Sequence, residues 1–338
     1  MFLPLTNDQA KQTIDCEQLF IGLQHTEKSL VDYAFGMHWK TVAGKEYLYR
    51  THDRRGNGKS LGVRSPDTEK IYQSFHARKT ELTERLAQLR TRMATMRRLN
   101  KALRLGSAPM DVANVCIQLN KAGLMGHGLT VIGTHALYAY ESLAGGRWSG
   151  DITATTDIDL LWHHKKKLSL AAKEEINPGG LIGILKKADN TFEIIDTQPY
   201  RAINASGYMV DLIKQTPSPP WKMEQYQMVQ GHDLVAVEIT NMRWLIDAPQ
   251  ITQAVIAQDG SMFNIAAPDP RAFAIFKLWL SQEPMREPIK RKRDLAQAQA
   301  VINVVNELLP HLGGNWMDLS SFPKEILAQF APAATSQF

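Results

Sequence analysis

The chain of 338 residues has few cysteines and no long apolar run, and both shortages restrict what it can be. Its only cysteines, Cys16 and Cys116, are too far apart in sequence for a disulfide framework or the paired spacing of a zinc site. No stretch approaches the roughly 18 apolar residues that a membrane helix needs, and the first residues carry no basic flank. We therefore expect a cytoplasmic protein with no membrane partner.

The sequence also lacks a strong excess of one charge and any internal repeat. Lys and Arg number 39 against 34 Asp and Glu, and this net charge of +5 permits an anionic partner without requiring one. The hydrophobic fraction of 44% and charged fraction of 22% are ordinary for globular proteins, which excludes collagen, full disorder and a disulfide mini-scaffold. The length suggests two or three domains.

The first third of the chain reads as a hairpin followed by a long helix. Residues 37–42 and 45–50 alternate in polarity around Ala43-Gly44, and Ser65-Pro66 is a typical helix start. The helix carries apolar residues at steps of three and four, as in a heptad seam: Leu82, Leu86, Leu89, Met93, Met96 and Leu103. The spacing predicts packing along this seam, either between two helices of one chain or between two chains as a homodimer.

The same helix is strongly basic. Nine Lys or Arg lie from Arg78 to Arg104 against Glu81 and Glu84, a local balance of +7. Charge-rich helix faces usually do no more than face solvent. The functional alternative is a surface that follows an RNA backbone, where each phosphate contact adds to the salt dependence of binding.

Residues 55–60, Arg-Gly-Asn-Gly-Lys-Ser, look at first like the end of a phosphate-binding P-loop. Asp53 stands where that motif needs its first glycine, and the segment follows a hairpin strand instead of opening a helix. We therefore interpret it as a basic hairpin tip.

After residue 106 helices and strands alternate. The patterns predict helices over 111–122, 134–143, 181–187, 269–280 and 288–309, and strands over 129–132, 158–162, 192–195, 208–213, 235–239 and 251–257.

One of these strands begins with an acidic pair, Asp157 and Asp159. Side chains two apart on a strand project from the same face, and two adjacent carboxylates repel unless a cation lies between them. Mg²⁺ suits such oxygen ligands and commonly takes one or two carboxylates plus substrate phosphates. Alone the pair is weak evidence, because acidic pairs at strand ends are often only solvated.

Two further features strengthen the case. Upstream, an apolar strand runs into Gly133-Thr134 and then a helix, which offers backbone N–H groups and a helix N-terminus to a phosphate. Downstream, Asp211 stands in the middle of an apolar strand, where a charge is costly unless it is paired or metal-bound. Together these residues indicate a site for a metal and a nucleotide.

Gly133-Thr134, Asp157-x-Asp159 and Asp211 resemble the glycine turn, acidic pair and third aspartate of the polymerase-beta nucleotidyltransferase superfamily. The resemblance is nearest to bacterial stand-alone proteins related to abortive-infection-type toxins, and its core motifs cover about residues 107 to 215. Two departures are Thr134, where glycine or serine is commoner, and a long gap before Asp157 that makes residues 145–150 an extra loop.

The resemblance implies an α+β fold in which helices flank a mixed sheet. Its expected parts are residues 1–106, with a hairpin and the long basic helix, a catalytic domain over 107–266, and a helical region over 267–338. It further implies a Mg²⁺-dependent enzyme that moves a nucleoside monophosphate from an NTP such as ATP to a hydroxyl. The basic helix favours an RNA 3′ end, tRNA-like or otherwise, as the acceptor, and a protein hydroxyl is the alternative.

By the same resemblance, Asp157, Asp159 and Asp211 hold two Mg²⁺, for which Mn²⁺ is an alternative, and Asp211 helps to activate the acceptor hydroxyl. Gly133, Thr134 and Lys277 contact the nucleotide, and toxin-like activity is suggested only by the relatives.

Other readings stay open at this point. The chain can be a catalytically silent module that binds RNA or a partner protein, or its acidic residues can be incidental in an unrelated α/β domain. The alternative for Lys277 is a solvated lysine on the outer face of its helix, which is the commoner situation for such a residue. We expect His163 and His164 to be structural or exposed. Nucleotide contact is one reading of His135, with a purely structural histidine as the other. Lys290–Arg293 either clamps phosphates or keeps a helix start soluble.

Overall fold

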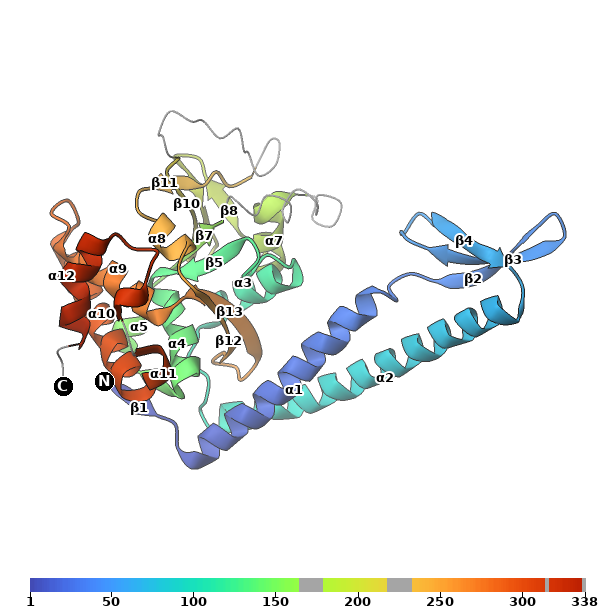
Figure 1. The fold of residues 1–338 in the computed structure, drawn as a ribbon, viewed down its shortest axis with the longest axis horizontal. Helices are drawn as coiled ribbons and strands as arrows, with labels where there is room; N and C mark the ends of the chain where they lie inside the picture. Colours follow the sequence, from blue (N-terminus) through green and yellow to red (C-terminus); the bar gives the residue numbers. More distant parts are fainter. Residues whose placement is uncertain (164–178, 218–232, 314–315, 336–338) are drawn as a thin grey trace. The chain divides into compact units, whose positions relative to one another are not determined.

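The computed structural model describes residues 1–163, 179–217, 233–313 and 316–335 (Figure 1). The chain forms two compact units, one made of Met1–Ala10 and Arg104–Phe338 and the other of Lys11–Leu103. The second unit ends close to the boundary expected at residue 106. The first ten residues belong with the later part of the chain, and the boundary expected after residue 266 falls inside a strand, β13 (Met262–Pro268).

The Lys11–Leu103 unit contains two long helices and a three-stranded antiparallel sheet in the order β2-β3-β4. Figure 1 shows the helices side by side. The bounds are α1 (Asn7–Val31), β2 (Met37–Val42), β3 (Lys45–Thr51), β4 (Gly58–Val63) and α2 (Pro66–Ala102). The predicted hairpin and long helix are confirmed, whereas α1 and β4 were not predicted.

Helix α2 begins as its sequence predicts. Ser65 caps the first turn, and its side chain and that of Thr68 each bond to the backbone of the other in a capping box, with Pro66 at the first helical position. Leu82 and Leu89 of the predicted seam are buried, and the seam packs against α1 of the same chain, where the amide of Gln12 donates to Asn100 over 2.9 Å. This is the within-chain form of the expected packing, and a homodimer through the helix stays a prediction.

The hairpin tip that resembles a P-loop is a turn between two strands. Asp53 accepts a hydrogen bond from the backbone N–H of Asn57 over 2.8 Å and another from its side chain over 2.7 Å. Strand β4 follows directly, so the segment opens no helix and the rejection of a P-loop is confirmed.

The larger unit is built on a six-stranded mixed sheet in the order β5-β7-β10-β9-β8, with β11 also pairing with β10. Strands β7 and β10 are parallel, and β5 and β9 run antiparallel to them. The bounds are β5 (Leu129–Ile132), β7 (Asp157–Trp162), β8 (Glu193–Ile195), β9 (Gln198–Ile203), β10 (Met209–Gln215) and β11 (Val237–Ile239). The mixed α+β fold expected from the sequence is confirmed.

Helices and a separate hairpin share one continuous hydrophobic core with this sheet. They are α3 (Met110–Lys121), α4 (Leu137–Ala144), α5 (Gly150–Thr153), α7 (Gly180–Ala188), α8 (Arg243–Ile246), β12 (Gln250–Ile256), β13, α9 (Pro270–Gln282), α10 (Pro288–Leu308), α11 (Pro310–Gly313) and α12 (Lys324–Thr335). Within the described residues no helix is both long and apolar enough to cross a membrane.

The loop at residues 145–150 is held by the start of the chain. Strand β6 (Gly146–Trp148) pairs antiparallel with β1 (Phe2–Pro4). The carboxylate of the buried Glu141 accepts hydrogen bonds from the backbone N–H of Trp148 over 2.7 Å and from the hydroxyl of Ser107 over 2.6 Å. Glu141 thus connects α4 both to β6 and to Ser107, which lies before α3.

We expect Leu82→Ala to destabilise the Lys11–Leu103 unit by about 2–5 kcal/mol, because Leu82 is only 3% exposed and its loss leaves a cavity. Leu99→Ala removes the same atoms from a side chain of α2 that is 43% exposed and should cost less than about 0.5 kcal/mol. Amide hydrogen exchange of α1 and α2 measures both values. Equal protection in the two variants would contradict the assigned packing of the seam.

A second prediction concerns pH. Burial raises the pKa of Glu141 from its ordinary 4.5 to about 7, against the lowering effects of Ser107, the Trp148 backbone and Arg147. The folded protein therefore favours the neutral carboxyl group of Glu141. This stabilisation of the folded state is complete below pH 4.5 and is lost as the pH rises through 7, a loss of roughly 1–3 kcal/mol. Denaturant unfolding between pH 5 and 8 should therefore show a flatter pH dependence for Glu141→Gln than for the parent. Glu193→Gln, at an exposed position, should keep the parental slope.

Candidate active site

Strand β7 places the two aspartates of the acidic pair on one face of the sheet. Asp157 and Asp159 are both half-buried, while Ile158 between them is fully buried on the opposite face. The hydroxyl of Thr155 donates a hydrogen bond to Asp157. The pair therefore projects together, as the sequence predicts.

Gly133 approaches the acidic pair so closely that no residue with a side chain fits in its place. In the register of β5 and β7, Ile132 is opposite Asp159, and the chain then turns at Gly133 with φ of +66°. A Cβ atom on Gly133 would stand 2.2 Å from Oδ2 of Asp159. The turn thus combines a left-handed backbone with a close approach to a carboxylate.

The third aspartate joins the pair through the register of the parallel strands. Asp211 on β10 is directly beside Asp159 on β7. The pKa of Asp159 is raised to about 7, first by burial and then by the carboxylates of Asp157 and Asp211, while Lys277 and Arg201 act in the opposite direction. The structure therefore brings the three aspartates of the predicted site together at one place on the sheet.

Arg201, on β9, was not predicted from the sequence. It is the cross-strand neighbour of the buried Asp211 and makes two hydrogen bonds to it, Nε to Oδ1 over 2.7 Å and Nη2 to Oδ2 over 2.6 Å. Nη1 also donates to Gln198 over 3.0 Å. The pair raises the pKa of Arg201 and supplies the partner that a buried charge requires.

This ion pair limits what the three aspartates can ligate as they stand. Among the described residues, no group of three or more His, Cys, Asp or Glu side chains is arranged to hold a metal ion. Asp157 and Asp159 nevertheless fit Mg²⁺, because their oxygen atoms are suitable ligands and a cation would relieve the repulsion that raises the pKa of Asp159. Asp211 can join them only when its bonds to Arg201 open.

Thr134 is tied to the C-terminal helices. It lies in a short 3₁₀ turn, Gly133–Ala136, that leads directly into α4. The side-chain amide of Gln297, a fully buried residue of α10, donates to the hydroxyl of Thr134 over 3.0 Å and to the carbonyl of Ile152 over 3.0 Å. One side chain of α10 therefore fixes both the glycine turn and the segment that precedes β7.

Lys277 is buried on α9, so the reading of it as a solvated lysine is wrong. Its Nζ donates to Asp294 of α10 over 2.6 Å, and Arg286 also bonds to Asp294. Burial lowers the pKa of Lys277, while its charge in turn lowers the pKa of Asp159. Two cations around one carboxylate leave a net positive charge on this side of the acidic pair.

The histidines have different surroundings. His135, in the glycine turn, is buried, which lowers its pKa to about 4 although Asp157 acts to raise it. Its ring lies 6.0 Å from that of Tyr208, the residue that precedes β10. His163 is buried with Nε2 2.9 Å from the hydroxyl of Thr130, in agreement with a structural role. His164 lies outside the described residues.

The basic run at Lys290–Arg293 begins α10. Lys290 is exposed and pairs with Glu287 over 2.9 Å. Arg293 bonds to the carbonyl of Ala154, shortly before β7, and is near enough to His135 to lower its pKa. Lys290 at the start of the run therefore faces solvent, whereas Arg293 at its end lies near the acidic pair.

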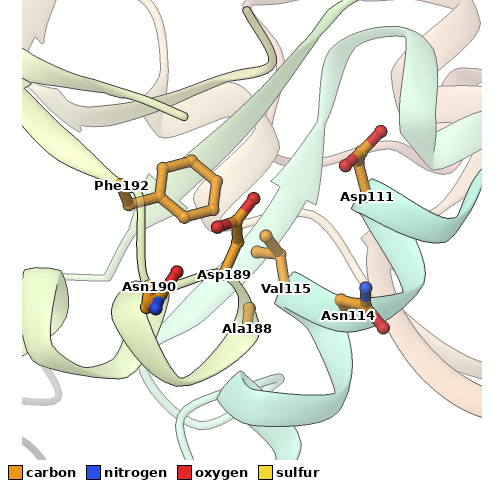
Figure 2. A pocket seen from close by; sticks show the side chains of 7 residues that line it. All are labelled: Asp111, Asn114, Val115, Ala188, Asp189, Asn190 and Phe192. Carbon is orange, nitrogen blue, oxygen red and sulfur yellow. The ribbon is translucent and has the colours of Figure 1, made fainter. Parts of the chain in front are cut away.

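A cavity of about 310 Å³ opens between α3 and the end of α7. Figure 2 shows Asp111, Asn114 and Val115 on α3, across from Asp189, Asn190 and Phe192, with Ala188 below them. Burial raises the pKa of Tyr208, and Cys116, Asp111 and Asp157 add to the shift in that order, so one cavity residue and one residue of the acidic pair both act on this buried hydroxyl. The two aspartates in the lining, Asp111 and Asp189, make this cavity unfavourable for phosphate groups.

The mixed sheet thus brings three aspartates together beside a glycine turn. The family model described as Nucleotidyltransferase matches residues 110–319, more than half of the chain, and the protein belongs to this family. The matched part includes every site residue named from the sequence, whereas the Lys11–Leu103 unit lies outside it. No curated protein and no solved structure matches the chain.

We expect Gly133→Ala to abolish most nucleotidyl transfer, because its Cβ displaces the carboxylate of Asp159. Gly145→Ala is the matched control, since Gly145 has the same φ of +66° but nothing within 4 Å of an added Cβ. Both changes should cost about 1–2 kcal/mol of stability through the left-handed backbone. Transfer assays and denaturant unfolding separate the two effects, and equal activity in both variants would contradict the close approach to Asp159.

Proposed function

We propose that the protein is a Mg²⁺-dependent enzyme of the polymerase-beta type that transfers a nucleoside monophosphate from an NTP to a hydroxyl group. The observation that carries the proposal is the register that sets Asp159 beside Asp211, with Asp157 on the same face and Gly133 in close approach. Oxygen ligands beside a phosphate-binding turn are what phosphoryl transfer requires, because its catalysis is mostly positioning and charge stabilisation.

Asp157 and Asp159 would hold Mg²⁺, for which Mn²⁺ is an alternative, and a second ion would need Asp211 released from Arg201. When bound, the metal supplies charge stabilisation to the phosphates and to the attacking oxygen. The turn at Gly133 and Thr134 presents backbone N–H groups to the phosphates. Lys277, whose charge together with that of Arg286 exceeds that of Asp294, offsets the negative charge of the triphosphate.

In the transfer, the acceptor oxygen forms a bond to the α-phosphorus while the bond from that phosphorus to the bridging oxygen breaks and pyrophosphate leaves. The hydroxyl proton passes to a carboxylate of the site, for which Asp211 is our candidate. Arg201 is a positioning residue before the reaction, because it holds both oxygens of Asp211 in fixed directions, and Asp211 would accept the proton once these bonds open.

An RNA 3′ end is the favoured acceptor and a protein hydroxyl the alternative, and a relation to abortive-infection toxins belongs to the same proposal. The alternative of a catalytically silent module loses support, since the chain belongs to a nucleotidyltransferase family and retains all three aspartates.

The test is to incubate the protein with Mg²⁺, each of the four α-labelled NTPs in turn, and a cell extract. The Asp157→Asn/Asp159→Asn variant runs beside it. Asp196→Asn is the control, because it removes an exposed carboxylate from the turn between β8 and β9. We expect label in RNA or protein with the parent and the control, and a loss of at least a hundredfold in the double variant, because asparagine cannot replace the carboxylate charge.

Nuclease and protease digestion of the labelled product identifies the acceptor. Label that moves equally well with the double variant would overturn the assigned site, and thermal melting of each variant excludes unfolding as the cause of a loss.

A further inference from the structure

The two units of the chain differ in the sign of their charge. The Lys11–Leu103 unit has 18 Lys and Arg against 10 Asp and Glu, a formal charge of +8. The rest of the chain has 21 basic and 24 acidic residues, a formal charge of −3. All of the positive excess therefore belongs to the unit that lies outside the nucleotidyltransferase match, which indicates a separate polyanionic partner for it.

Within this unit the charge is concentrated in the sheet and in α2. Residues 37–64 contain seven Lys and Arg against two acidic residues, and residues 66–102 contain nine against four. On α2 the cations stand beside the buried seam. Arg85 and Arg92 lie seven residues apart on one line of the helix, both exposed and in no ion pair with any described residue, and Arg98 is exposed in the same way.

The sheet has one face inside the unit and one outside. Met37 and Leu48 point inward and pack with Phe75 of α2. On the other face Tyr47 and Tyr49 stand in line on β3, opposite Lys40 and His38 of β2. The tyrosines are half-buried and their two partners exposed, with Nζ of Lys40 5.3 Å from the ring centre of Tyr49. We call this the outer sheet face, defined by His38, Lys40, Tyr47 and Tyr49.

We propose that the outer sheet face and the basic side of α2 bind an unpaired nucleic-acid strand. Aromatic rings on an exposed sheet stack unpaired bases, and cations nearby contact the phosphates, which is how many proteins hold single strands. RNA and DNA share the phosphodiester backbone and the unpaired bases that this surface would contact. The experiment therefore tests an RNA strand and a DNA strand separately. This inference extends the proposed function. It rests on that function only if the bound strand is also the acceptor of the transferred nucleoside monophosphate.

The test uses the full chain, without Mg²⁺ or NTP, and fluorescence anisotropy with labelled strands of about 20 nucleotides. The strands are RNA, DNA of the same sequence, and a DNA without bases. We expect binding of RNA, DNA or both, and the ratio of the two Kd values shows which nucleic acid is preferred. The strand without bases should bind at least fivefold more weakly. Heparin, a polyanion without bases, should compete poorly.

Two variants locate the contact. Tyr47→Leu/Tyr49→Leu should raise Kd about tenfold by removing the stacking rings. Arg92→Gln/Arg98→Gln should lower the slope of log Kd against log salt by about 1.4, or about 0.7 for each lost phosphate contact. Lys121→Gln/Lys324→Gln removes two exposed cations from the other unit and should leave both quantities unchanged.

Parental binding by the tyrosine variant, with its circular dichroism intact, would overturn the proposal. So would equal binding of the strand without bases, which would mean that charge alone is recognised. Tyr47→Leu alone, which keeps the hydrogen bond from Tyr49 to Gly58, serves if the double variant unfolds and should still weaken binding. The Asp157→Asn/Asp159→Asn variant should bind strands as the parent does, so a failure of strand binding and a failure of nucleotidyl transfer are told apart.

Discussion

The parallel pairing of β7 with β10 is the constraint on which the site depends. It sets Asp159 level with Asp211, and because side chains alternate along a strand, a slip of one residue would turn one of them into the core. The apolar neighbours fix the register, since Ile158, Val210 and Leu212 are fully buried on the other face. The same hydrophobic pattern that closes the core therefore also assembles the carboxylates.

Three carboxylates at one place create an electrostatic cost, and several features of the unit offset it. Arg201 neutralises Asp211 through two hydrogen bonds, and Lys277 acts on Asp159 from α9. Lys277 is itself held by Asp294, so the C-terminal helices are part of the charge balance. The bond from Gln297 to Thr134 ties the same helices to the glycine turn. The family match likewise continues beyond the sheet, to residue 319, and includes these helical contacts.

The sequence predicts the parts of the site that depend on local pattern. An apolar strand before Gly133, an alternating strand at Asp157 and an aspartate inside an apolar strand can each be recognised from neighbouring residues alone. Arg201 cannot, because β9 has no clear alternation and its role appears only in the cross-strand register with Asp211. The one available indication was that a buried aspartate needs a cation close by. The burial of Lys277 could not be predicted, because α9 is buried on nearly every side and its sequence shows no separate outer face.

The first unit shows a different limit of sequence reasoning. Helix α1 was missed because it buries few residues, Cys16, Leu19, Phe20 and Thr26, too few for a visible apolar period. Its partner surface is the seam of α2, so the unit completes its own core with the small cluster of Met37, Leu48 and Phe75 under the sheet. The exposed positions of this unit take no part in that core. The excess of lysine and arginine there is therefore not required by the fold, which is why charge and aromatic placement on this unit carry information about a partner.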